Sequence, residues 1–133
     1  MSAEFFRAVD NNFEALALLA AEVSAFSAAT GLPDKTARHI DVAVEELLTN
    51  VVKYGYDDDA SHQIKVTLAT AERSATLTVV DDGHFFDPTG VPPRAINDPR
   101  VGGWGLMLVR QYAQSLTYER HGDENLSRVV FVW

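Results

Sequence analysis

Apolar residues recur with the period of an α-helix in three stretches of the chain, residues 13–30, 33–54 and 106–114. The first stretch is the most apolar part of the sequence, and Glu14 and Glu22 interrupt it, which predicts an amphipathic helix. In the second stretch, a turn of about 100° per residue places five apolar residues on one stripe: Ile40, Val44, Leu47, Val51 and Tyr54. We therefore predict three helices that each bury one face.

Individual residues mark the expected ends of these helices. Asp10 or Asn11 is a candidate N-cap for the first helix, because either side chain can accept a hydrogen bond from a free backbone N–H group. Asp34 is the corresponding candidate for the second helix. Gly31 predicts the end of the first helix, and Gly55 predicts a left-handed residue that ends the second.

The remaining patterned segments are short and predict β-strands. Apolar and polar residues alternate over residues 64–70 and 75–80, and two further strands are predicted at 116–120 and 126–132. A candidate edge strand precedes them all, at residues 3–9. Tight turns join the strands into two hairpins, so the sheet should be largely antiparallel. The sequence predicts an α+β fold: a two-layer α/β sandwich whose mostly antiparallel sheet carries its helices on one face.

Composition narrows the class of protein. The chain has 133 residues, of which 47% are hydrophobic and 23% charged, and this is typical of one globular domain spanning residues 1–133. It has no cysteine, which excludes disulfides, thiolate metal sites and a cysteine nucleophile. The net charge of −8 without a basic cluster argues against nucleic-acid binding. No apolar run is long enough to span a membrane, so we expect a cytoplasmic protein that binds neither nucleic acid nor membrane.

The second predicted helix carries a polar stripe beside its apolar one. Glu46, Asn50 and Lys53 follow one another at spacings of four and three residues, so they share one side of the helix. A carboxylate, a carboxamide and an ammonium group in line are what a metal–phosphate site needs. An ordinary solvated helix face carries the same groups, and this alternative stays open for the stripe alone.

Asp81, Asp82 and Gly83 directly follow the predicted strand at residues 75–80. Asp81 comes after two apolar residues, and we expect it to be partly buried. A buried carboxylate needs a hydrogen-bond donor, and an exocyclic amine such as that of adenine would supply one. The alternative is an ordinary turn, because Asp-Gly is among the commonest turn dipeptides.

A long segment without periodicity, residues 84–101, separates this strand from the third helix. Loops of this length inside small domains are usually functional or mobile. Gly102, Gly103 and Gly105 end the segment and lead into the helix, where backbone N–H groups and the helix dipole could hold a phosphate. The glycines lack the Lys-Ser/Thr of a P-loop, and a simple hinge or helix start is the alternative.

Taken in order, these motifs resemble those of the GHKL, or Bergerat-fold, ATPases. E-x-x-x-N-x-x-K on a helix is followed by D-x-G after a strand, then by a long loop and G-G-x-G-L before another helix. The segments E-L-L-T-N-V-V-K-Y-G-Y, D-D-G-H-F-F-D-P and G-G-W-G-L-M-L-V are most similar to the small anti-sigma branch of RsbW/SpoIIAB-type serine-protein kinases. The resemblance covers residues 13–133 and implies a histidine-kinase-like ATPase domain of the anti-sigma factor kinase type.

The resemblance implies roles for residues of both polar motifs. Asn50 corresponds to the magnesium ligand of the family, and Glu46 corresponds to its general base. Lys53 matches a position near the phosphates. Asp81 corresponds to the aspartate that reads adenine, and Gly83 to the glycine that lets the base approach.

The resemblance also implies that residues 85–101 form a lid over ATP. The cofactor-binding positions at its far end are Gly103, Gly105 and Leu106. Ser127 stands where the family often has a threonine near adenine. Phe85 replaces the second glycine of the family's D-x-G-x-G motif, and this departure leaves open how the lid begins.

The activity implied by the resemblance is ATP-dependent phosphorylation of a protein serine. Glu46 would orient or deprotonate the serine hydroxyl, with ATP and Mg²⁺ as cofactors. The substrate would be a STAS-domain anti-anti-sigma protein, a sigma factor would be a competing partner, and a homodimer is the expected assembly. One alternative is a nucleotide-gated protein-binding module without kinase activity, and another is a structural domain that binds no nucleotide.

Overall fold

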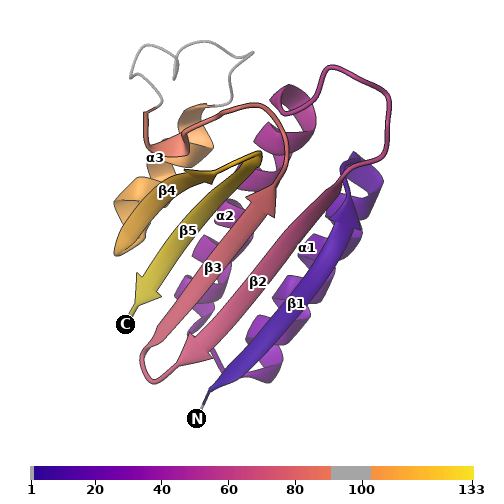
Figure 1. Cartoon of the computed structure of the whole chain (residues 1–133). Coiled ribbons are helices and arrows are strands. Elements are labelled where there is room, and N and C mark those ends of the chain that lie inside the picture. Colours follow the sequence, from indigo (N-terminus) through magenta and orange to yellow (C-terminus); the bar gives the residue numbers. More distant parts are fainter. Residues whose placement is uncertain (1, 91–102) are drawn as a thin grey trace.

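Five antiparallel strands form one sheet in the part of the chain that a computed structural model describes, residues 2–90 and 103–133. The strands are β1 (Ala3–Asp10), β2 (Gln63–Ala71), β3 (Ser74–Asp81), β4 (Ser115–His121) and β5 (Glu124–Val132), in the order β1-β2-β3-β5-β4. The helices are α1 (Phe13–Ala29), α2 (Asp34–Tyr54) and α3 (Gly103–Tyr112), with a 3-10 turn, η1, at Pro88–Gly90. All three helices lie behind the sheet in Figure 1, so the predicted α+β two-layer sandwich is confirmed.

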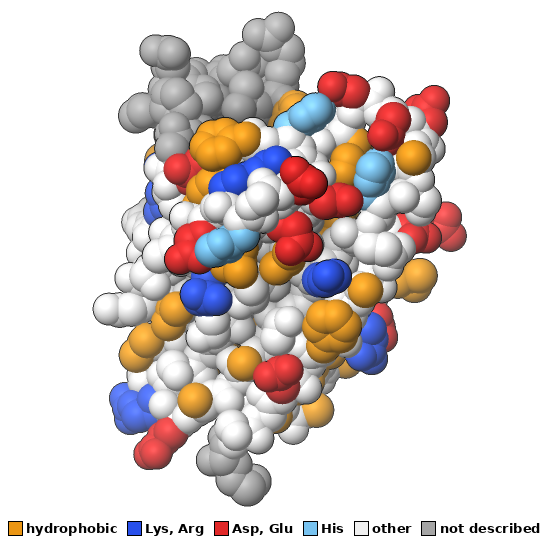
Figure 2. Space-filling model, viewed as in Figure 1, with side chains coloured by type: hydrophobic (Ala, Val, Ile, Leu, Met, Phe, Trp, Pro, Cys, Tyr) orange, Lys and Arg blue, Asp and Glu red, His pale blue; other side chains and the backbone are white. Residues whose placement is uncertain are grey.

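The strand patterns explain why one face of the sheet is covered. Buried and partly exposed residues alternate along β3 and β5, as the period of two requires. Leu68, Leu77 and Val129 point into the helical layer and are fully buried. Figure 2 shows the opposite face, where acidic and histidine side chains gather near the start of β2 and the end of β3. The core therefore lies between the sheet and the helices, and the other face meets solvent.

Helix α2 packs on the sheet through the stripe predicted from its sequence. Ile40, Val44 and Leu47 are at most 4% exposed. Tyr54 was expected on the same stripe, but it is 37% exposed, so that prediction is wrong. Tyr54 is the last residue of α2, and helical period does not reveal where the covering sheet ends.

Several predicted helix ends differ from the observed ones. Asn12 caps α1 by accepting a hydrogen bond from the Ala15 N–H, because β1 continues through Asp10. Asp34 is the first helical residue of α2 and makes no capping bond. Gly31 follows the end of α1, as predicted, and has a left-handed backbone with a φ of 73°. Helix α3 begins at Gly103, three residues before the predicted start.

Gly55 ends α2 for a reason other than the predicted one. Its φ is −77° and its ψ is −24°, which is a right-handed helical conformation open to any residue. A Cβ atom at Gly55 would lie 2.5 Å from the Val51 carbonyl oxygen. Close packing, and not a left-handed turn, therefore requires glycine here.

Helix α1 is not amphipathic, contrary to the sequence prediction. Its polar residues are Glu14, Glu22, Ser24 and Ser27. Apolar residues occupy its exposed side as well as its buried side, and Phe13 and Leu18 are 56% and 66% exposed. The two glutamates interrupt the apolar run without dividing the helix into two faces. Across the described residues, no helix is both long enough and apolar enough to cross a membrane.

Candidate functional site

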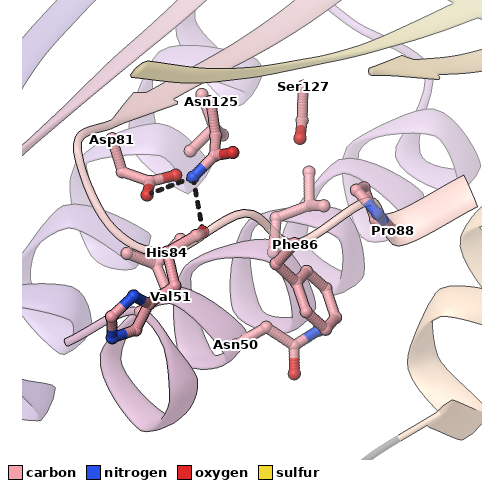
Figure 3. A pocket seen from close by; sticks show the side chains of 11 residues that line it. Asn50, Val51, Asp81, His84, Phe86, Pro88, Asn125 and Ser127 are labelled. Carbon is pink, nitrogen blue, oxygen red and sulfur yellow. Dashed lines mark hydrogen bonds between the residues drawn. The ribbon is translucent and has the colours of Figure 1, made fainter. Parts of the chain in front are cut away.

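A pocket lies where α2 and β3 end and β5 begins, at the edge of the two layers (Figure 3). Its lining residues are Leu47, Asn50, Val51, Gly55, Val79, Asp81, His84, Phe86, Pro88, Asn125 and Ser127. Asn50 and Asp81 were predicted as site residues from separate motifs, and the fold brings both to this pocket. The predicted position Ser127 also lines it.

The pocket is nearly filled by the protein's own side chains. The space open to water is about 20 Å³, which is room for about one molecule. Phe86 and Pro88, from the segment after β3, line it, and Pro88 is fully buried. A ligand as large as a nucleobase does not fit this space, so its binding here requires lining residues to move.

Asp81 is the central polar group of the pocket. It ends β3 and is only 7% exposed. Its Oδ2 accepts hydrogen bonds from the Gly83 N–H at 2.9 Å and from Asn125 Nδ2 at 3.1 Å. Burial raises the pKa of Asp81, and the two hydrogen bonds oppose that shift. No group among the described residues donates to Oδ1, which leaves that oxygen able to accept a bond from a ligand.

Asn125 is a residue of this site that the sequence interpretation missed. Besides binding Asp81, its Nδ2 donates to the Gly83 and His84 carbonyl oxygens at 3.3 and 2.8 Å. Its Oδ1 accepts from Arg120 at 3.0 Å and from the Tyr118 hydroxyl. Arg120 also donates to the Gly83 carbonyl at 2.9 Å. Asn125 thus ties the carboxylate and the following turn to the β4–β5 hairpin.

Asn125 falls in the turn predicted between the strands at residues 116–120 and 126–132, and not in a predicted strand. Strand β5 begins at Glu124, two residues before the predicted start, and this places Asn125 opposite Asp81 in the β3–β5 register. Strand boundaries are the least certain part of a sequence pattern. Because the predicted strand begins two residues too late, it does not include Asn125, the residue opposite Asp81.

Asn125→Ala is expected to destabilise the protein mainly at neutral pH. The substitution removes one of the two donors to the buried Asp81 carboxylate and the donor to the His84 carbonyl, at a cost of about 1–3 kcal/mol. Because the folded-state pKa of Asp81 is raised, its ionisation above that pKa already costs stability, and losing Asn125 increases the cost. Below that pKa the carboxyl is protonated, so the penalty shrinks. Urea unfolding of both proteins at about pH 4 and pH 7.5 measures the difference, and an equal penalty at both would contradict this role.

Gly83 and Gly55 let the turn after β3 pack against the end of α2. A Cβ atom at Gly83 would lie 2.7 Å from the Gly55 carbonyl oxygen. That same carbonyl accepts the His84 N–H at 2.7 Å. Tyr56, just beyond α2, donates its hydroxyl to Asp82 at 2.7 Å. The two segments therefore hold the Asp81 turn in place from the α2 side.

The polar stripe of α2 is only partly inside the pocket. Asn50 is 5% exposed, and its Nδ2 is buried without a hydrogen-bond partner among the described residues. Glu46 is half-buried and Lys53 is exposed, and neither lines the pocket. Burial, followed by repulsion from Glu45, raises the pKa of Glu46, whereas Lys53 lowers it. Glu45 is exposed, as predicted.

The acidic turn after α2 does not form a metal site. Asp58 Oδ1 is 2.8 Å from His62 Nε2, and Asp57 Oδ2 is 2.9 Å from His84 Nε2. Within residues 2–90 and 103–133, no three histidine, aspartate or glutamate side chains are placed to hold a metal ion. The carboxylates of this turn instead pair with neighbouring histidines.

The predicted lid and glycine segment are described only at their ends. Residues 91–101 of the lid, together with Gly102, lie outside the described residues. Phe85 is 67% exposed and its ring meets Tyr118 edge-on, with centroids 5.4 Å apart. Gly103 and Gly105 lie in the first turn of α3, and the Leu106 side chain is buried in the core. Leu106, predicted as a cofactor-binding residue, does not line the pocket around Asp81.

Comparison with known sequences identifies the type of domain. Residues 9–133 match the family described as histidine kinase-like ATPase domain. The chain is 31% identical over 90 residues to serine/threonine-protein kinase BtrW of Bordetella bronchiseptica. This alignment covers 65% of this chain and 63% of BtrW. It is 30% identical over 87 residues to serine-protein kinase RsbW of Oceanobacillus iheyensis. That alignment covers 59% of this chain and 55% of RsbW. The match thus spans less than two thirds of either relative.

Solved structures share the fold. The crystal structure of the RsbU and RsbW domains of Rv1364c from Mycobacterium tuberculosis superposes with a TM-score of 0.74 at 18% identity, over 98% of this chain and 32% of that one. The SiaB–SiaC complex from Pseudomonas aeruginosa gives a TM-score of 0.63 at 11% identity, over 97% and 89%. At such identities the likeness concerns the fold alone. The family match over residues 9–133 shows that the chain belongs to the histidine kinase-like ATPase domain family.

Proposed function

We propose that this chain binds ATP in the pocket around Asp81 and transfers the γ-phosphoryl group to a serine of a partner protein. The observation that carries the proposal is the buried Asp81 carboxylate, which is held through Oδ2 and has Oδ1 free among the described residues. A fixed acceptor of this kind suits the exocyclic amine of adenine. Ser127, 9% exposed, lines the same pocket and would assist in binding adenine.

Asn50 is the residue proposed to hold Mg²⁺. Its side chain is buried at the pocket, and its Nδ2 is buried without a hydrogen-bond partner among the described residues, which marks the carboxamide as a candidate for ligand binding. Mg²⁺ prefers oxygen ligands and is usually bound by few protein groups together with substrate phosphates. The amide oxygen of Asn50 fits this requirement. When bound, the ion would neutralise phosphate charge.

The phosphate end of the nucleotide is assigned to the start of α3. Gly103 and Gly105 lie in its first turn, where backbone N–H groups have no partner within the helix. Lys53 is exposed on α2 and can approach a phosphate from the other side.

Glu46 is proposed as the group that orients or deprotonates the serine hydroxyl. A general base works best when its pKa approaches the working pH, and burial raises the pKa of Glu46 in that direction. Its position one helical turn before Asn50 places it on the same side of α2. Glu46 does not line the pocket, and the pocket has little open space. The serine hydroxyl of the partner protein would therefore reach Glu46 from outside the pocket.

The proposed protein substrate is a STAS-domain anti-anti-sigma protein, with a sigma factor as competing partner. The names of BtrW and RsbW, both protein kinases, support the serine-kinase part of this proposal. The fold shared with the Rv1364c RsbW domain is consistent with it. We infer that the nucleotide state selects which partner is held.

A nucleotide-gated binding module without kinase activity is the second candidate. It is favoured by one observation: Asn50 and Asp81 line the pocket, whereas Glu46 does not. Calorimetric titration with Mg-ADP first tests nucleotide binding. A pull-down with and without ATP, followed by mass spectrometry, then tests for a partner phosphorylated on serine. A partner that is retained in the presence of ATP but is not phosphorylated supports the binding module without kinase activity. If the chain binds no nucleotide, both the kinase and the nucleotide-gated module are excluded.

A further inference from the structure

Helix α1 is almost entirely apolar, yet several of its apolar side chains are exposed to solvent. Only four of its 17 residues are polar. Its buried residues are Leu16, Leu19, Val23 and Ser27. A helix that is apolar on all sides is normally buried on all sides, yet Phe13 and Leu18 are largely exposed. The outer surface of α1 therefore has the composition of a contact surface.

A groove of about 490 Å³ runs between α1 and α2 beside this surface. Leu16 and Val44, both buried, line it together with small residues of α1. The small residues are Ala17, Ala20, Ala21 and Ser24, and Phe13 lies at the same stretch of α1 one turn earlier. Small side chains along one helix leave room for large side chains of a facing helix.

The charged residues that line the groove all have the same sign. Asp41 and Glu45 line it from α2, and none of its lining residues is Lys or Arg. Asp41 is half-buried, burial raises its pKa, and it has no hydrogen-bond or ion-pair partner in the described part of the chain. A cationic group that entered the groove would therefore meet unpaired carboxylates.

Charge also decides which occupant fits. A second copy docked through the same face would bring the same groove lining, so it would add two more carboxylates and no Lys or Arg from that lining. The chain carries a net charge of −8, so an anionic lipid surface would be repelled as well. A helix with an apolar stripe flanked by Lys and Arg fits both the apolar lining of the groove and its two carboxylates.

We propose that the groove between α1 and α2 docks an amphipathic helix of another protein, with large apolar side chains on one stripe and basic residues beside it. The apolar side chains pack between the alanines of α1 and Val44, and the basic ones pair with Asp41 and Glu45. Glu46 and Asn50 lie on the other side of α2, as the helical period requires. Groove and nucleotide pocket can thus be occupied together.

The test uses a synthetic 18-residue helical peptide, about five turns long, with leucines at helical spacing and lysines on both flanks. A twin peptide carries glutamate in place of each lysine. The lysine peptide should shift the backbone amide NMR signals of Ala17, Ala21 and Thr49 in the whole chain, and the glutamate peptide should not. Equal binding of the twins, or shifts confined to other surfaces, would overturn the proposal.

Two matched variants separate the groove from general attraction to an acidic protein. Ala17→Arg fills the groove and adds a positive charge, and Ala25→Arg makes the same change on an exposed residue of α1 outside the lining. Ala17→Arg should lower the affinity for the lysine peptide at least about tenfold. Ala25→Arg should change the affinity by less than about twofold. Equal weakening would assign binding to net charge alone and overturn the proposal.

Sedimentation of the unliganded protein examines the other occupant. Self-association that Ala17→Arg abolishes and Ala25→Arg retains would show that a second copy covers the groove, and would overturn the proposal of a different protein. A monomer, or an assembly unaffected by either substitution, leaves the groove free for the partner helix. Circular dichroism and unchanged Mg-ADP affinity verify that both variants fold, independently of whether the proposed kinase activity exists.

Discussion

Asp81→Asn is expected to weaken ATP and ADP binding about 30- to 150-fold, which corresponds to about 2–3 kcal/mol. The substitution removes the charge of the acceptor and can turn an amide N–H₂ toward the adenine amine, where two donors face each other. Asp82→Asn is the matched control, because it makes the same change on the adjacent, exposed residue. Calorimetric titration with Mg-ADP measures both variants against the original chain.

Loss of folding does not explain the expected result for Asp81→Asn. The raised pKa of Asp81 means that its ionised form costs stability in the folded protein at neutral pH. A neutral asparagine removes that cost and can still accept from Gly83 and Asn125 through its oxygen. The free energy of unfolding should therefore stay level or rise. Unchanged nucleotide affinity in a folded Asp81→Asn variant would refute the assignment of the adenine site.

Glu46→Gln is expected to lower the rate of phosphoryl transfer about 10²- to 10⁴-fold, the range for loss of a general base. Nucleotide affinity should change by less than about twofold, because Glu46 does not line the pocket. Single-turnover transfer from labelled ATP to the partner serine measures the rate, and titration with Mg-ADP measures the affinity. Transfer at the original rate would exclude Glu46 as the base.

Glu45→Gln is the matched control for Glu46→Gln, and it has a signature of its own. Repulsion from Glu45 helps to raise the pKa of Glu46. A base acts in its deprotonated form, so the rate should rise with pH through that pKa. Removing the Glu45 charge lowers the pKa of Glu46, and the rising part of the pH profile should move to lower pH while the maximal rate is kept. No displacement of the profile would contradict this electrostatic link.

The sequence was most informative where a pattern is local. Alternation fixed which residues of β3 face the core, and because β3 ends at Asp81, the same period turned that carboxylate inward. The period of α2 placed Asn50 beside the core and Glu45 in solvent. These features depend on the backbone geometry of one element, which neighbouring residues determine.

Contacts between distant segments could not be derived in this way. The order β3-β5-β4 places Asn125 beside Asp81, although the two are 44 residues apart in the chain. Gly55 was assigned to a left-handed turn because its sequence neighbours do not reveal that its carbonyl meets Gly83 and His84. Likewise, the apolar run of α1 predicted burial, but only the packing of α1 on α2 shows which side remains open.

By itself, the sequence determined the two-layer α+β fold and the polar stripe of α2, since each follows from a repeat of two or about 3.6 residues. It also predicted a partly buried Asp81 from the two apolar residues before it. The tertiary structure alone decided that Asp81 is held by Asn125, that Asn50 reaches the pocket while Glu46 stays outside it, and that an acidic groove lies between α1 and α2. Periodicity states which way a side chain points. What it meets there depends on the packing of elements far apart in the chain.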